Sequence, residues 1–244
     1  MEAFYPPPEQ FQLSENQGQF LPIHIHPKKP EPPQPPCYAH SMNSTQDAQI
    51  QAQLDRPNAG IPLPARLFLR HVLRTMVIKK TPWQESCENF ERAHKKFLAE
   101  IQKLTPEQLN RRVLIPRIVG LEDSSRYWSP IMVARHLVIV GQAIEWMIVE
   151  LSHGRTDKLP KADTAAVKPE TDLDAQKVLS EYQAFGDGFL ARVESAVGNR
   201  DSELTHLHPW FGPMRSKDWM WLMGRHTGIH RQQLKKILET AQKI

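Results

Sequence analysis

The spacing of apolar residues changes once along the chain, near Pro64. Beyond that residue, apolar side chains recur at intervals of three and four, which is the period of an amphipathic helix. Four such stretches are long enough to be bundle helices: residues 81–104, 129–153, 171–199 and 216–242. Between Thr81 and the end, no stretch has the pattern of a buried parallel strand or an alternating hairpin. The pattern therefore predicts an all-α fold, a four-helix bundle with one or two crossover connections.

Capping residues support these helices. Thr81 followed by Pro82, and Ser129 followed by Pro130, each combine a residue that caps a helix with a proline suited to its first turn. Gly154 is a stop signal for the second helix, because glycine adopts the left-handed conformation common just after a helix. The same Thr-Pro pair opens "TPEQLN", where we expect one short helical turn, and "RRVLIPRIVGLEDSSRYW" is predicted to be an irregular or extended crossing.

The region before Pro64 has a different composition. Thirteen of the 21 prolines lie in residues 1–64, together with Gln-rich runs such as "QDAQIQAQLD". Few aliphatic residues there could offset the entropy lost on ordering the backbone, so we expect residues 1–63 to be a disordered tail. The short apolar stretches "FQL" and "FLPIHIHP" are either docking motifs or parts of an untethered leader, and the composition favours the leader.

Residues 64–80, including "ARLFLRHVLRTMVIKK", are predicted to form a basic amphipathic helix. Its apolar stripe consists of Leu69, Val72, Leu73 and Met76, and Arg66, Arg70 and Arg74 line another face. Such a helix could make weak contact with an anionic membrane surface. It could also pack its stripe onto the main domain and leave its arginines in solvent, which we favour. The predicted organisation is therefore a tail at 1–63, a basic helix at 64–80 and a bundle at 81–244.

The net charge of +4 comes from that one helix. Residues 1–64 hold three basic and six acidic side chains, residues 66–80 hold five basic and none acidic, and residues 81–244 are nearly balanced at 23 against 21. Because one short segment produces the alkaline pI, that pI is weak evidence for a nucleic-acid-binding domain. We therefore expect no nucleic-acid partner.

Cysteine usage and the N-terminal residues suggest a cytoplasmic protein. Cys37 and Cys87 lie far apart, so the chain offers neither a disulfide framework nor a cysteine-based zinc site, and a reducing compartment is expected. "MEAFYPPPEQ" lacks the features of a secretory signal or transit peptide. The most apolar stretch, "HLVIVGQAIEWMIVEL", contains a His, a Gln and two Glu, and is shorter than the roughly 20 apolar residues of a bilayer span.

Histidines occupy predicted core positions on two helices. His136 shares its helix face with Val133 and Ile144, and a buried imidazole needs either a hydrogen bond or a metal. His226 and His230 are four residues apart, so both rings project from one face and could reach the same ion. Thr227 stands where a zinc-peptidase helix would have glutamate. From the residues alone, hydrogen-bonded and metal-bound histidines both remain open.

Three segments carry a resemblance to a known family. "ARHLVIVGQ", "HPWFGPM" and "WMWLMGRHTGIHRQQLKKI" look like the DinB-like superfamily of metal-binding four-helix bundles, over residues of about 84–242. The resemblance implies that His136, His226 and His230 form a three-histidine site for a divalent ion, zinc or nickel. Gln233 matches the glutamine of the family's HRxQ ending, and its spacing allows a hydrogen bond to a ligand histidine or to metal-bound water.

Three histidines leave a tetrahedral ion one further position, which catalytic sites keep open. Some members of the superfamily resemble transferases that place a low-molecular-weight thiol on such a metal. The resemblance therefore implies a metal-dependent transferase of the thiol S-transferase type, or a hydrolase. The alternative is a non-enzymatic stress or interaction protein in which the histidine cluster is structural. Dimerisation through an outer bundle face is open.

No residue is assigned as a catalytic acid or base. Glu145 follows His136 by nine residues, about half a turn round the helix wheel, and should face away. Glu122, Asp123 and Tyr127, in the irregular crossing, could approach the site, although no spacing rule places them there. His206 and His208 could also reach the metal, but "HPWFGP" is better interpreted as a turn whose Trp210 and Phe211 close the end of the bundle.

Overall fold

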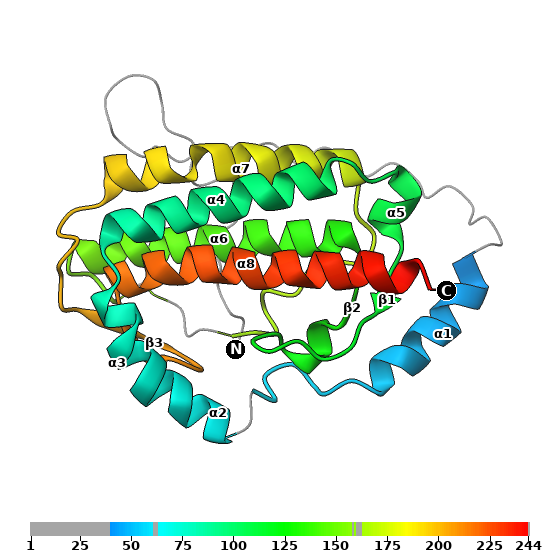
Figure 1. Ribbon diagram of the computed structural model, residues 1–244, viewed down its shortest axis with the longest axis horizontal. Helices are drawn as coiled ribbons and strands as arrows, with labels where there is room; N and C mark the ends of the chain where they lie inside the picture. Colours follow the sequence, from blue (N-terminus) through cyan, green and yellow to red (C-terminus); the bar gives the residue numbers. More distant parts are fainter. Residues whose placement is uncertain (1–39, 61–62, 158, 160–162, 244) are drawn as a thin grey trace.

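The computed structural model describes residues 40–60, 63–157, 159 and 163–243 of the chain, and four long helices dominate them. They are α4 (Trp83–Ile101), α6 (Pro130–Ser152), α7 (Ala175–Ala196) and α8 (Ser216–Ala241). α8 packs against α4 and α6, and α6 also packs against α7 (Figure 1). Fully buried Phe97, Ile144 and Phe189 lie in the core that these helices share. The predicted four-helix bundle is confirmed.

The order of the helices includes one long crossover. In Figure 1, α4 and α8 run in one direction and α6 and α7 in the opposite one. The connection from α6 to α7 therefore returns along the length of the bundle, whereas the other connections lie at its ends. Residues 163–174 of this crossover lie beside α6, and the carbonyl oxygen of Val167 contacts His136 on that helix.

The helix ends follow the predicted signals closely. The Ser129 hydroxyl accepts a hydrogen bond from Met132 N, with Pro130 in the first turn. Gly154 follows α6 with a φ of 77°, a left-handed conformation that glycine adopts without strain. The short helix predicted at "TPEQLN" is α5 (Pro106–Asn110), whose N-cap Thr105 forms a capping box with Gln108. α4 begins one residue later than expected, with Pro82 as its N-cap.

The expectation that no hairpin occurs after Thr81 is wrong. β3 (Thr205–His208) pairs in antiparallel fashion with β4 (Gly212–Arg215), and β1 (Val113–Leu114) pairs with β2 (Tyr127–Trp128). Between β1 and β2 lies one 3-10 turn, η4 (Asp123–Ser125). These strands have two to four residues, too few for an alternating pattern to stand out in the sequence. The "HPWFGP" segment is the turn of the β3–β4 hairpin, as predicted, and Phe211 is buried there.

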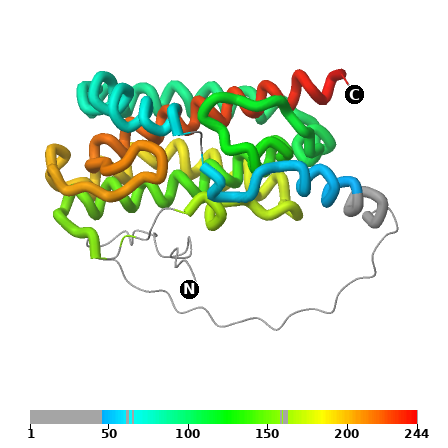
Figure 2. Tube along the Cα trace, turned by 90° about the horizontal axis from the view of Figure 1, so that it is seen from below, coloured from blue at the N-terminus to red at the C-terminus, as the bar shows by residue number. Residues whose placement is uncertain are grey.

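Part of the predicted disordered tail is ordered. α1 (His40–Ala52) and the turn after it lie along the connections that precede α6 and α7, as Figure 2 shows in blue. Arg112 donates to Asp47 at 2.9 Å, and the Tyr127 hydroxyl donates to the same carboxylate at 2.5 Å. Polar side chains hold this segment in place, so its low aliphatic content was a poor guide to its order. Residues 1–39 lie outside the described residues.

The predicted basic helix consists of several short helical pieces. They are α2 (Leu63–Leu67), the π-helix η2 (Phe68–Leu73), α3 (Arg74–Met76) and the 3-10 turn η3 (Ile78–Lys80). Leu69 and Leu73 pack against the core, whereas Val72 and Met76 are exposed. The apolar stripe is therefore only half buried, and the expectation that all of it packs onto the domain is wrong.

α6 is long and apolar enough to cross a membrane by length and composition alone. In the fold, 61% of its most apolar window is buried inside the bundle. Its apolar character therefore reflects its position as the core helix between α7 and α8.

Candidate metal centre

Three imidazoles converge between α6 and α8. His136 projects from α6, and His226 and His230 project from successive turns of α8. The ligand nitrogens of the three side chains lie within 4.8 Å of one another. His226 Nε2 is 3.3 Å from His136 Nε2 and 3.1 Å from His230 Nε2. The structure thus brings together the three histidines that the sequence singled out.

The outward-facing nitrogen of two rings is held by an acceptor. His136 Nδ1 lies 2.8 Å from the carbonyl oxygen of Val167, and His230 Nδ1 lies 2.6 Å from Gln233 Oε1. Gln233 Nε2 donates to the Ser125 carbonyl at 2.7 Å, which fixes the orientation of the amide. Because carbonyl oxygens only accept, both Nδ1 atoms carry the proton and both Nε2 atoms present a lone pair. Ligand histidines in metal sites are oriented in this way.

The lone pairs of His136 and His230 both face His226 Nε2. Burial, reinforced by the neighbouring imidazoles, holds the pKa of His136 and His226 well below the ordinary value. Burial also lowers the pKa of His230 to about 4, against a smaller opposing effect of Gln233. The rings are therefore neutral near pH 7. His226 Nδ1 is buried and has no hydrogen-bond partner among the described residues, so no neighbour fixes the tautomer of this ring.

The spacing fits a metal ion. Zn–N bonds of about 2.0–2.1 Å in a tetrahedral site place two ligand nitrogens about 3.3 Å apart. The two observed separations are 3.3 and 3.1 Å. All three nitrogens lie within 4.8 Å of one another, and three neutral imidazole nitrogens are a donor set suited to zinc or nickel. The cluster is compatible with a divalent metal ion.

Trp128 forms an apolar wall beside the cluster. Its ring lies 6.1 Å from that of His230 at an interplanar angle of 8°, and 5.0 Å from that of His136. A cavity of about 340 Å³ is also lined by Trp128, together with Met132, Arg112 and Lys168, but by none of the three histidines. Trp128 therefore borders both this cavity and the histidine cluster. His226 is the most exposed of the three histidines.

The acidic residues suggested from the sequence are engaged elsewhere. Glu122 is buried and accepts hydrogen bonds from Ser124, Thr164 and Asn58. Asp123 binds the guanidinium groups of Arg117 and Arg126, and accepts from the backbone of Asp55. Tyr127 donates to Asp47. Glu122, Asp123 and Tyr127 thus bind the N-terminal segment, and none of them belongs to the group of converging ligand atoms.

The other candidates outside the cluster also have different roles. Both carboxylate oxygens of Glu145 bind Arg192 on α7, so this side chain faces away from the histidines, as predicted. His208 Nδ1 accepts from the backbone N–H groups of Trp210 and Phe211 in the hairpin turn. Burial, and secondarily Arg70, lower the pKa of His208 to about 3. Neither His206 nor His208 belongs to the group of converging ligand atoms.

Sequence reasoning missed how the surroundings of the cluster are held. The acceptors Val167 O and Ser125 O are backbone atoms, which no residue type reveals. The two loops that supply them meet at Asn58. Its backbone N–H donates to Glu122 Oε1 at 3.1 Å, and its side chain bonds Asp163 and Thr164. One residue of the supposed tail thus joins both loops beside the histidines.

No curated protein matches the sequence. TT2238, a four-helix bundle protein of known crystal structure, is similar to this chain with 22% sequence identity and a TM-score of 0.45. The alignment covers 63% of this chain and 98% of that one.

The family comparison covers the bundle and the cluster. The sequence model of the DinB superfamily matches residues 89–234. This range contains His136, His226, His230 and Gln233. This range is more than half of the chain. The segment at 40–80, which contacts the loops beside the cluster, lies outside it. By this match, the chain belongs to the DinB superfamily.

Proposed function

We propose that this protein binds a divalent metal ion through the Nε2 atoms of His136, His226 and His230. One observation carries the proposal. The three nitrogens converge at metal-site spacing while Val167 O and Gln233 hold two of the rings in the tautomer that a ligand requires. Zinc and nickel both accept imidazole ligands, so both are candidates.

We further propose that the site serves a transferase of the thiol S-transferase type, or a hydrolase. When bound, a divalent ion would supply Lewis-acid chemistry, which lowers the pKa of a coordinated thiol or water toward neutrality. His136 and His230 would contribute fixed, neutral ligands, and Trp128 would exclude water from one side. No carboxylate among the described residues belongs to the cluster, so the chain offers no obvious base there. A reaction whose nucleophile is activated by coordination needs none.

A second candidate is a non-enzymatic stress or interaction protein in which the cluster fastens α6 to α8. The nearby cavity favours this candidate, because Trp128, which contacts His136, lines it while none of the three histidines does. A structural metal site that joins α6 to α8 needs no path for a substrate, whereas the site of a transferase or hydrolase does. The two candidates share the metal and differ in access to it.

Metal content tests the site. The full chain, purified without a histidine tag, should contain close to one zinc or nickel per chain by plasma mass spectrometry. His136→Ala and the double variant His226→Ala with His230→Ala should each lose it. His153→Ala is the matched control, because His153 is exposed and bonds the carbonyl of Ala196 instead. Wild-type protein that stays metal-free after reconstitution would refute the metal site.

Access tests the reaction class. Cobalt-substituted protein should change its visible absorption when a small thiol such as cysteamine is added, if a coordination position is open to solutes. The change should be absent from the double histidine variant. Metal-loaded protein whose spectrum no thiol changes would contradict the transferase and favour the fastener.

A further inference from the structure

The described part of the chain exposes large hydrophobic side chains mainly in one segment. Eight such residues are more than a third exposed, and six of them lie within residues 63–77. They are Leu63, Leu67, Phe68, Val72, Met76 and Val77, with exposed fractions between 40 and 66%. A concentration of this kind on one surface marks an interaction site more often than chance exposure. We call this set the apolar face.

The segment that carries the apolar face is fixed to the domain. Ile78 is 1% exposed, and Leu69 and Leu73 pack against the core. Arg70 donates to the carbonyl oxygens of Pro209 at 3.0 Å and Trp210 at 3.3 Å in the hairpin turn. The helix is therefore anchored by its inner side, and its apolar face points outward because of how it docks.

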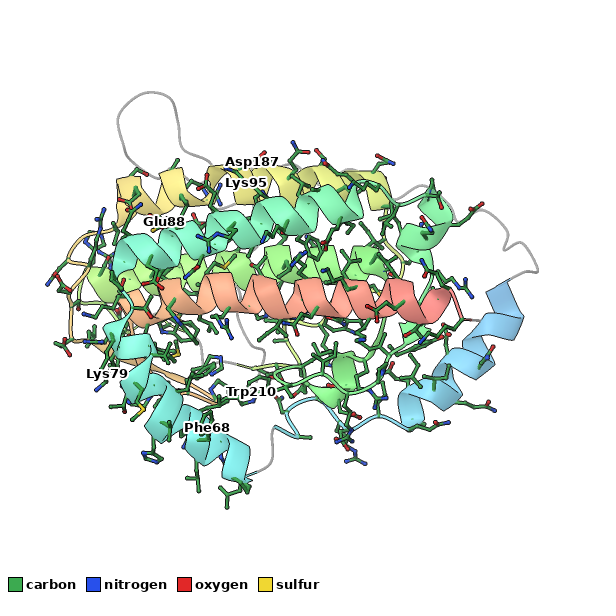
Figure 3. All side chains as sticks on the ribbon, viewed as in Figure 1. Phe68, Lys79, Glu88, Lys95, Asp187 and Trp210 are labelled. Carbon is green, nitrogen blue, oxygen red and sulfur yellow. The ribbon has the colours of Figure 1, made fainter. Side chains whose placement is uncertain are left out.

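Basic residues accompany the apolar face. Between Asp55 and Glu85 the chain has six Lys and Arg residues and no acidic one. Arg66, Lys79 and Lys80 are exposed, and none pairs with a carboxylate in the described part of the chain. The Arg70 guanidinium, in contrast, donates its hydrogen bonds to the hairpin turn. Figure 3 shows Phe68 and Lys79 on this helical segment at the edge of the molecule, with Trp210 between it and the bundle.

We propose that the apolar face is a docking surface for an anionic lipid bilayer. Apolar side chains at the headgroup boundary, flanked by lysine and arginine, are the features by which a helix lies on such a surface. A second copy of this chain fits less well, because a symmetric contact would bring Arg66, Lys79 and Lys80 of both copies together without a compensating acid. This surface lies outside the histidine cluster and does not depend on metal.

Vesicle binding by the full chain tests the proposal. The protein should co-float with vesicles of phosphatidylcholine containing 30% phosphatidylglycerol, and not with pure phosphatidylcholine vesicles. Binding should weaken as salt is raised from 0.1 to 0.5 M, because the lipid charge is screened. Replacing Arg66, Lys79 and Lys80 with Gln removes three charges and should weaken binding on the order of 100-fold.

The apolar contribution is tested separately by Leu67→Ser with Phe68→Ser. This pair should abolish flotation, while circular dichroism and metal content remain those of the wild type. Leu207→Ser is the matched control, because Leu207 is 68% exposed but lies on β3. It should bind vesicles as the wild type does.

Three results would overturn the proposal. Equal binding to both kinds of vesicle would remove the role of the basic residues. A concentration-dependent dimer in sedimentation that Leu67→Ser with Phe68→Ser abolishes would assign the face to a second copy. A wild-type chain that is monomeric and binds neither kind of vesicle would refute the lipid-docking role of the face.

Discussion

The bundle buries histidine in two places, and the surroundings differ. Between α4 and α7, His94 is 3% exposed and its Nε2 lies 3.1 Å from Asp187 Oδ1. Between α6 and α8, three imidazoles face one another and no carboxylate joins them. At the first place one acid partners His94 Nε2, while Nδ1 of the same ring is buried with no hydrogen-bond partner among the described residues. Three converging Nε2 atoms without a carboxylate form a donor set compatible with a divalent cation, and this distinguishes the second place from the first.

The space for the two groups is also made differently. His94 occupies room left by Gly186, where an added Cβ would lie 2.0–2.5 Å from the ring atoms. The space beside His136 and His230 is bounded by Trp128, and their outer nitrogens are held by the crossover loop and by Gln233. At the first place, the absence of a side chain at Gly186 makes room for one imidazole ring. The second orients several side chains toward one point.

The largest expected effect is on metal-dependent stability. At a free metal concentration of about 1,000 times Kd, the wild type should gain roughly 4 kcal/mol in the free energy of unfolding. The double variant His226→Ala with His230→Ala should gain nothing, and His94→Ala should keep the gain although it is less stable. Urea unfolding with and without metal measures this difference. If His94→Ala also lost the metal-dependent gain in unfolding free energy, His94 would be required for metal binding, and the difference between the two histidine sites would not hold.

Acid should destabilise the metal-free protein through the cluster. A histidine in an unfolded chain titrates near 6.5, whereas burial lowers the pKa of His230 to about 4. Between these values the unfolded chain binds a proton that the folded chain does not, so the stability is full above pH 6.5 and falls as the pH approaches 4. The loss from His230 alone is about 3 kcal/mol. Urea unfolding in EDTA from pH 7 to 4.5 measures it, and His230→Gln should lose less.

Gln233→Ala should lower metal affinity without removing the site. The variant loses the acceptor at His230 Nδ1 but keeps all three ligands. Loss of such a partner costs about 10-fold to 100-fold in affinity. Competition with a chromophoric chelator measures the affinity. Asp187→Ala removes the acceptor of His94 and is the matched control, which should leave the metal affinity unchanged.

Gly186→Ala tests the packing around His94. The new methyl group would meet the ring, and overpacking of a core costs about 1–3 kcal/mol. Metal content should not change. Gly228→Ala is the control on α8, because nothing lies within 4 Å of its added Cβ, and alanine should stabilise the helix by roughly 0.5–1 kcal/mol. A Gly186→Ala protein of unchanged stability would show that the His94 ring moves freely.

The sequence predicted the parts of this molecule that depend on side-chain type and helical period. The four bundle helices, the cap at Ser129 and the inward positions of His136 and His230 follow from such patterns. The hairpin after α7 did not, because strands of four residues give no usable period. The ordered segment near Asp47 did not either, because individual polar contacts hold it rather than apolar burial.

The surroundings of the cluster were the least predictable part. Gln233 could be identified because it matches the glutamine of the family's HRxQ ending and because its spacing allows contact with a ligand histidine. Val167 and Ser125 could not, because their backbone carbonyls make the contacts and any residue would provide these. The connection of both loops to Asn58 spans 64 residues or more of sequence, so no local pattern encodes it.

Asn58→Gly isolates that connection and has the smallest expected effect. Asn58 has a φ of 66°, which glycine adopts without strain, so the variant removes the side chain and keeps the backbone conformation. The lost hydrogen bonds to Asp163 and Thr164 should loosen the loop that carries Val167, at a cost of about 1 kcal/mol. Part of that cost should appear as a severalfold faster release of metal to excess chelator, measured by stopped flow. An unchanged release rate would mean that the N-terminal segment stabilises the fold but does not hold the histidine cluster.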